Sequence, residues 1–128
     1  MEYHYSKIVP LAFDAAIAKV TEELKKEGFG ILTEIDVQAT LKKKLDVEFR
    51  PYRILGACNP HFAYKAFQME DHIGVLMPCN VIVQDRGAGR AEVSAVNPMS
   101  SMQSVQNPAL GEVASEVTAR LRKVIDSL

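Results

Sequence analysis

Two cysteines, each followed by an asparagine, are the residues of this 128-residue chain whose type and spacing favour a shared site. Cys58 and Asn59 lie in "ILGACNPHF", and Cys79 and Asn80 lie in "VLMPCNVIV". Thiols act as nucleophiles and as ligands for soft metals, and amide side chains hydrogen-bond to polar groups of a ligand. The repeated pair therefore raises the hypothesis of one common site.

The residues themselves leave three interpretations of the cysteines open. Cysteine is often buried as a small hydrophobe, so both thiols could be core residues at strand ends. Alternatively, Cys58 could be a catalytic thiolate, because a helix that begins just after it would lower the thiol pKa, with His61 near in sequence. The third interpretation is a site for copper(I) or zinc. Its candidate ligands are Cys58, Cys79, His61, and Met99 or Met102.

The metal interpretation is the weakest of the three, because its ligand set lacks the closely spaced pair of most zinc sites. No metal is therefore expected from the sequence. His4 and His72 are isolated, and the chain contains no P-loop, dinucleotide-binding glycine motif or serine–histidine–acid pattern, so no cofactor is identified. The lysine triplet 42–44 is typical of a solvated helix face, because acidic residues follow it closely.

Helices and strands are expected to alternate in the order β-α-β-α-β-α-β-β-α. Alternating or continuous apolar runs predict strands at residues 3–9, 30–35, 52–57, 73–77 resuming at 81–83, and 91–96. Apolar residues three and four apart predict helices that begin near residues 13, 37, 60 and 108. Gly28 is expected to end the first helix, Asp36 and Asn59 to cap the second and third, and residues 97–107 to form a loop. The predicted fold is a single-domain α/β (α+β) sandwich, with a mixed sheet that ends in an antiparallel hairpin.

The predicted strand ends place the two pairs at one edge of the sheet. A strand–helix–strand unit usually crosses over with its strands parallel, so the strands before Cys58 and Cys79 are expected to be parallel neighbours. Glu34 and Asp36, at the end of the second strand, reach the same edge if that strand is parallel too. Ligands bind at this carboxyl edge in open α/β sheets. The candidate ligand-binding residues are therefore Glu34, Asp36, Cys58, Asn59, His61, Cys79 and Asn80.

Charge and composition narrow the function. Residues 1–64 carry nine basic and nine acidic side chains and residues 65–128 carry six and seven, so no basic excess favours nucleic acid. No apolar run approaches the roughly 20 residues of a membrane span, and the start lacks the pattern of a signal peptide. We expect a cytoplasmic protein, not bound to nucleic acid or membrane, with reduced thiols.

Three segments of the chain resemble a known family. "EGFGILTEID", "ILGACNP" and "IGVLMPCNVIV" are similar to the prokaryotic domain of unknown function 302, and the likeness spans nearly the whole chain. The family's Gly-Ala-Cys-Asn-Pro and Pro-Cys-Asn patterns match residues 56–60 and 78–80. The resemblance implies a small single-domain α/β protein that forms dimers, and it supplies no activity, cofactor or catalytic residue.

The expected function is the binding of a small molecule, in a regulatory role, by a homodimer with a pocket at the carboxyl edge of the sheet. A dimer is also expected because the outer strand of the predicted hairpin, residues 73–96, needs a cover. The alternatives are a thiol-dependent enzyme that uses Cys58 and a protein that binds a soft metal. The ligand, any reaction and the dimer surface are not determined by the sequence.

Overall fold

A five-stranded antiparallel sheet forms the centre of the molecule in the computed structural model, which describes residues 2–128. The strands are β1 (His4–Val9), β2 (Gly30–Asp36), β3 (Tyr52–Cys58), β4 (Cys79–Gly87) and β5 (Arg90–Val96), in the spatial order β1-β5-β4-β3-β2. The helices are α1 (Phe13–Lys26), α2 (Val37–Leu45), α3 (Pro60–Met69), α4 (Pro98–Ser101) and α5 (Leu110–Asp126), with a 3-10 turn η1 (Ile73–Leu76). The single-domain α/β fold and the predicted order of the main elements are confirmed.

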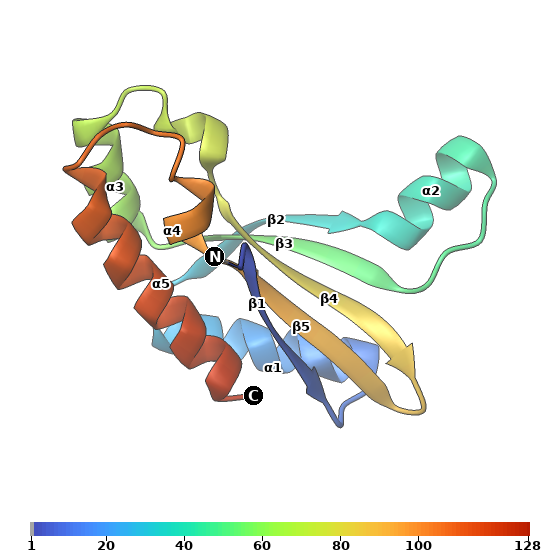
Figure 1. The fold of residues 1–128 in the computed structure, drawn as a ribbon. Coiled ribbons are helices and arrows are strands. Elements are labelled where there is room, and N and C mark those ends of the chain that lie inside the picture. The colour runs from blue at the N-terminus through green and yellow to red at the C-terminus, as the bar shows by residue number, and fades with distance from the viewer. Residues whose placement is uncertain (1) are drawn as a thin grey trace.

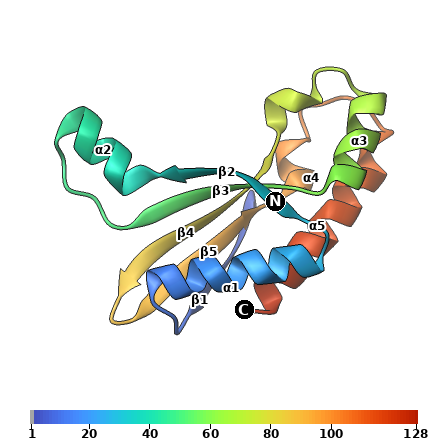
Figure 2. The same ribbon diagram turned by 180° about the vertical axis from the view of Figure 1, so that it is seen from behind.

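Helices α1 and α5 cover one face of the sheet (Figures 1 and 2). The apolar stripe of α1, including Val20 and Leu24, packs with Leu121 and Val124 of α5 and with the inward residues of β3, β4 and β5. In the middle of β4, Val81 and Val83 are fully buried and Ile82 between them is not, as expected for a sheet with one covered face. The opposite face has no helix over it in the part of the chain that the structure describes, and polar side chains line it.

Several local predictions are confirmed by backbone geometry. Gly28 has φ +85°, its N–H bonds to the carbonyl of Lys25, and the N–H of Phe29 bonds to that of Leu24. This hydrogen-bond pattern ends α1 and folds the buried Phe29 back toward Leu24. Asp36 caps α2 by accepting a 2.9 Å hydrogen bond from the N–H of Ala39. The expected loop 97–107 contains the single helical turn α4.

The prediction of parallel strands is wrong. β3 and β4 are antiparallel, with Ala57 opposite Cys79, and the expected strand at residues 73–77 is the 3-10 turn η1. A short apolar run does not distinguish a buried strand from a buried turn, since burial makes both apolar. Instead of crossing over the sheet, α3 and η1 turn the chain back, so β4 begins at the edge where β3 ends. All neighbouring strands are antiparallel, and the sheet is therefore not mixed.

The hairpin of β2 and β3 extends beyond the helix-covered body and carries α2 at its tip (Figure 1). We call residues 32–50 the arm. None of the residues of α2 is buried, although Val37, Leu41 and Leu45 form the predicted apolar stripe. Among residues 2–128, no helix is long and apolar enough to cross a bilayer.

Candidate functional site

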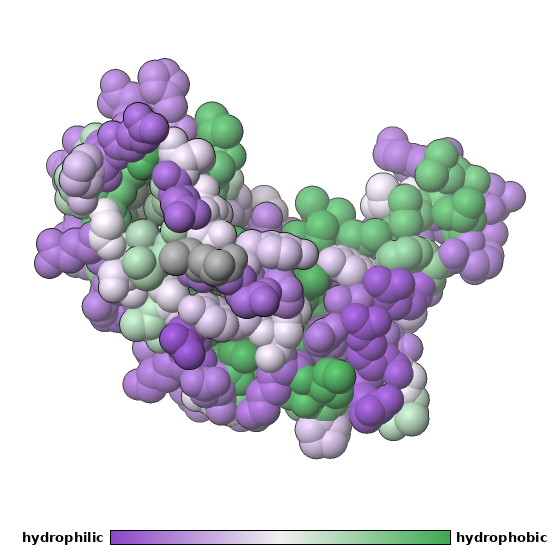
Figure 3. Space-filling view, viewed as in Figure 1, coloured by the Kyte–Doolittle hydropathy of each residue, from purple (hydrophilic) through white to green (hydrophobic). Residues whose placement is uncertain are grey.

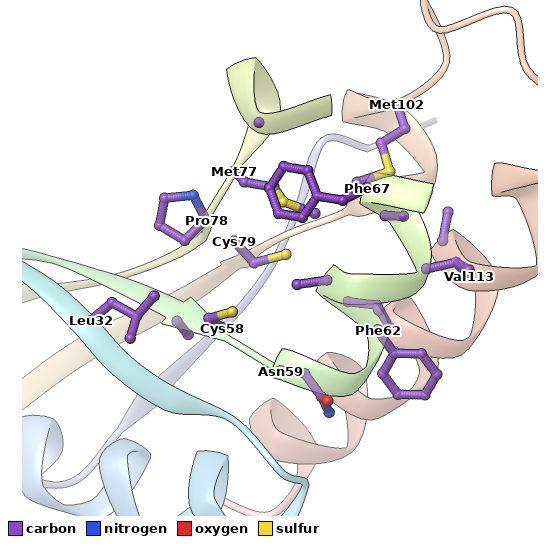
Figure 4. A pocket seen from close by; sticks show the side chains of 16 residues that line it. Leu32, Cys58, Asn59, Phe62, Phe67, Met77, Pro78, Cys79, Met102 and Val113 are labelled. Carbon is purple, nitrogen blue, oxygen red and sulfur yellow. The ribbon is translucent and has the colours of Figure 1, made fainter. Parts of the chain in front are cut away.

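The two cysteines lie side by side at one end of the sheet. Cys58 is the last residue of β3 and Cys79 is the first residue of β4, one step out of direct register because Ala57 pairs with Cys79. Both side chains line a cavity of about 250 Å³ and extend toward it in Figure 4. The expectation that the cysteines are neighbours is thus confirmed, although antiparallel strands bring them together.

Helices α3 and α5 form the far wall of this cavity, which we call the thiol cavity. Its lining is almost wholly apolar. The lining residues are Leu32, Ala57, Cys58, Asn59, Phe62, Ala63, Ala66, Phe67, Gly74, Met77, Pro78, Cys79, Met102, Val113, Ala114 and Val117. Such a surface favours an apolar ligand because it offers few hydrogen bonds to replace those that a polar ligand makes with water.

A β-bulge in β2 supplies one side of the cavity mouth. Ile31 pairs with Ala57 and Thr33 pairs with Gly56, so Leu32 between them has no partner in the register. A bulge turns its extra side chain away from the regular alternation. Leu32 remains 68% exposed although it lines the cavity, so the mouth presents a large apolar side chain to water.

Gly56, in the sequence Gly-Ala-Cys-Asn-Pro, makes room for this corner. A Cβ atom there would collide with the hydroxyl of Thr33 and lie 2.8 Å from Cγ of Pro78. The Met77–Pro78 peptide bond is cis. The absent side chain therefore lets β2, β3 and the start of β4 approach closely beside the two thiols.

Burial keeps both thiols in the neutral form. It raises the pKa of Cys58 above its usual value and, together with the neighbouring Cys58, raises the pKa of Cys79 to about 11. From the sequence we expect the opposite, because the positive end of a helix that begins just after Cys58 lowers the pKa of its thiol. Desolvation outweighs that effect, so neither thiol is poised as a nucleophile at neutral pH.

Asn59 has an architectural contact in place of the expected capping bond. It occupies the N-cap position of α3, but its side chain makes no bond to the first turn in the described chain. Its amide nitrogen instead donates a 3.2 Å hydrogen bond to the carbonyl oxygen of Glu27, at the end of α1. Asn59 is 8% exposed and thereby ties α1 to the junction of β3 and α3.

The remaining predicted site residues do not reach the thiol cavity. Asn80 pairs with Gly56 in the ladder, is exposed, and lines a separate depression of about 530 Å³ on the uncovered sheet face. His61 is exposed and stacks edge-on against Phe62, with ring centroids 5.6 Å apart. The prediction of one pocket joining both Cys-Asn pairs is therefore wrong for Asn80 and His61.

Glu34 and Asp36 lie at the wrong end of β2 for the cavity. β2 is antiparallel to β3, so Gly30 at its start pairs with Cys58, while Asp36 pairs with Arg53. Arg53 forms ion pairs with both carboxylates, at 2.5 Å to Glu34 and 3.6 Å to Asp36. The expectation that they share an edge with the thiols fails because it required parallel strands.

Sequence reasoning missed the aromatic and thioether side chains of the cavity. Phe62, Phe67 and Met77 line it but are indistinguishable in the sequence from ordinary core residues. The one available signal is that α3 places apolar residues on more than one side of the helix, including Phe67, which is 47% exposed. Residues 2–128 contain no cluster of three or more histidine, cysteine or acidic side chains that could hold a metal ion.

The fold and the thiol cavity together define a small single-domain α/β protein with an apolar cavity at one end of an antiparallel sheet. The chain belongs to the family described as Domain of unknown function DUF302, whose pattern matches residues 5–128. A crystal structure of an uncharacterized conserved DUF302 protein from Bacillus stearothermophilus is similar, with 29% sequence identity, a TM-score of 0.90 and 98% coverage of both chains. No curated protein matches the chain.

Proposed function

We propose that this protein binds a small, largely apolar molecule in the thiol cavity, in a regulatory role and as a homodimer in the cytoplasm. The observation that carries the proposal is the cavity itself, about 250 Å³ of space lined almost wholly by apolar side chains. An apolar cavity of about 150 Å³ is enough to bind benzene. The thiol cavity therefore suits a ligand of one substituted ring or a short branched chain.

The mouth of the cavity supports a ligand rather than a packing defect. Leu32 is 68% exposed and Phe67 is 47% exposed, and both also line the cavity. Exposed apolar residues that surround an opening are typical of binding sites. An apolar ligand would bury both side chains and gain free energy in proportion to the area removed from water.

The thiol-dependent enzyme has weaker support from this geometry. Burial raises the pKa of Cys58, and the exposed His61 stacks on Phe62 rather than lining the cavity with the thiol. A catalytic thiolate needs the opposite environment, with a nearby cation or base. The cysteines fit better as neutral, polarisable parts of the cavity wall.

A thermal-shift screen of small aromatic and aliphatic compounds tests ligand binding. We expect at least one compound to raise the melting temperature of the wild type, because a ligand that binds only the folded state stabilises it. Ala63→Leu, on the cavity wall, should abolish that shift by filling the space. Ala119→Leu, on the exposed side of α5, is the matched control and should keep it. A shift that survives Ala63→Leu, or no shift from any compound, would contradict the proposal.

The arm supports the homodimer. α2 packs mainly on β2 and β3, and the exposed apolar side chains of the arm include Ile35, Leu45 and Val47. A helix of nine residues is marginal without tertiary packing, so this apolar surface needs a partner. The outer strand of the β4–β5 hairpin does not need a second chain to cover it, as the sequence suggested, because β5 pairs with β1. The free edges of the sheet are β1 and β2.

A second copy of this chain is the partner that we infer for the arm. Lys43 and Lys44 lie on the arm, whereas exposed Asp71 lies near Val75, which is 84% exposed, on the lobe formed by α3 and η1. The arm and this lobe rise on either side of a hollow (Figure 3). Turning a second copy by 180° in the plane of the figure brings each arm to the other copy's lobe, which gives a closed two-fold dimer.

A further inference from the structure

Four sulfur atoms surround the thiol cavity. The thiols of Cys58 and Cys79 and the thioethers of Met77 and Met102 all belong to its lining. In Figure 4 the side chains of Cys58, Cys79 and Met77 follow one another along one wall, and Met102 approaches from α4. The ends of β3, η1 and α4 and the start of β4 thus bring together four of the chain's seven sulfur-containing side chains, which are two cysteines and five methionines.

Other kinds of metal ligand are missing from the same wall. Asn59 is the one polar amide in the lining, and its nitrogen is already hydrogen-bonded to Glu27. The lining contains no carboxylate and no imidazole. Hard cations such as magnesium and calcium need oxygen ligands, and a structural zinc site needs four nitrogen, oxygen or thiolate ligands. A wall of two thiols and thioethers instead suits a soft cation.

We propose that Cys58 and Cys79, assisted by the thioether of Met77, form a binding site for a soft monovalent metal ion of the copper(I) class. This activity goes beyond the binding of an apolar molecule and uses the cysteine wall of the cavity rather than its whole volume. It also replaces the ligand set suggested by the sequence, because exposed His61 lies outside the lining and Met77 lies within it.

The binding step is an exchange of protons for metal. Two S–H bonds break, two copper–sulfur bonds form, and two protons leave to solvent, while copper enters and remains as copper(I). The complex carries one negative charge. Helix α3 begins at Pro60, two residues after Cys58, and Asn59 makes no side-chain bond to its first turn in the described chain. The positive end of the helix dipole therefore lies beside the sulfur pair and favours the added negative charge.

The protonated thiols make the affinity depend on pH. Cysteine binds a metal as the thiolate, so the metal must displace a proton from each thiol at neutral pH. Each displaced proton strengthens apparent binding by about tenfold per pH unit, so two protons give about a hundredfold between pH 7 and pH 8. A metal held only by neutral thioethers would show no such dependence.

Competition for copper(I) against the chelator bicinchoninate, without oxygen, tests the site on the whole protein. We expect one copper(I) per chain and the pH dependence given above. Cys58→Ser and Cys79→Ser should each weaken binding by at least about a hundredfold, and Met77→Leu, a volume-conserving change, by about tenfold. Met99→Leu is the control, because Met99 is 41% exposed and does not line the cavity.

Melting of the variants and a comparison of copper binding with the apolar-ligand thermal shift separate this inference from the proposed function. Circular dichroism melting of each serine variant shows whether a loss of copper binding reflects unfolding, and Cys58→Ser, at the less buried thiol, is the decisive variant. Copper binding without a thermal shift from any apolar compound would support the copper site and reject the proposed function. A thermal shift without copper binding would support the proposed function and reject the copper site. Failure of the folded wild type to compete, or unchanged binding by a folded Cys58→Ser variant, would overturn the copper site.

Discussion

Ala57 pairs directly with Cys79 across antiparallel strands, and this single register places Cys58 next to Cys79. Opposite residues in such a ladder have Cα atoms about 5 Å apart, and one step along a strand adds about 3.3 Å. The Cα atoms of the two cysteines are therefore about 6 Å apart, within the range that a disulfide spans.

Mild oxidation should join Cys58 to Cys79 within one chain. Diamide would take two electrons and two protons from the thiols, and the chain would lose the mass of two hydrogen atoms. Intact-mass analysis under non-reducing conditions measures this change, and Cys58→Ser should not show it. Oxidation that yields only disulfides between chains would contradict the deduced proximity.

Gly56→Ala should destabilise the fold by about 1–3 kcal/mol, because overpacking forces the surrounding structure to shift. The added Cβ would collide with Thr33 and Pro78. Gly30→Ala is a matched control in β2, because a Cβ at Gly30 meets nothing within 4 Å. Urea unfolding of both variants measures the difference, and equal effects at the two glycines would contradict the close approach at Gly56.

The two asparagines should respond differently to removal of their amides. Asn59→Ala leaves the half-buried carbonyl of Glu27 with Arg120 as its remaining donor and should cost about 0.5–1.5 kcal/mol. Asn80→Ala, at an exposed position, should change stability by less than about 0.5 kcal/mol. Thermal melting compares the two variants. A large loss of stability in Asn80→Ala would contradict the exposed position of this side chain.

Both thiols should react slowly at neutral pH. The pKa of Cys58 is raised and that of Cys79 is about 11, so the reactive thiolate is scarce near pH 7. Alkylation by iodoacetamide, followed by peptide mass analysis, should be slower than that of glutathione and should accelerate by about tenfold per pH unit between pH 7 and 8. Faster alkylation of Cys58 than of glutathione at pH 7 would favour the enzyme interpretation.

Charge reversal should control the proposed dimer. Replacing Lys43 and Lys44 by glutamate places negative charge opposite Asp71 of the second copy and should weaken association, as seen by sedimentation velocity at micromolar concentration. Adding Asp71→Lys to the same chain should restore the dimer. Lys25→Glu, at an exposed position of α1, serves as the control. A wild type that remains monomeric at every concentration would refute the dimer.

The sequence by itself determined the local structure, because local signals depend on neighbouring residues. The spacing of Phe13, Ile17, Val20 and Leu24 predicted α1, and the backbone freedom of glycine predicted its end at Gly28. Asp36 likewise predicted the start of α2, because its short side chain can accept a hydrogen bond from the free N–H groups of a helix's first turn. The repeated Cys-Asn sequence correctly indicated that the two cysteines lie together.

The tertiary structure alone decided strand direction, and with it the membership of the site. Whether β4 runs parallel or antiparallel to β3 depends on where α3 packs, and α3 packs on α5 from a distant part of the chain. The antiparallel arrangement brings Met77 and Phe67 to Cys58 and moves Asp36 to the far end of the sheet. Apolar residues carry no sequence signal that separates a cavity wall from a filled core, because both are lined by the same side chains. Only the packing of helices against strands determines which of them enclose empty space.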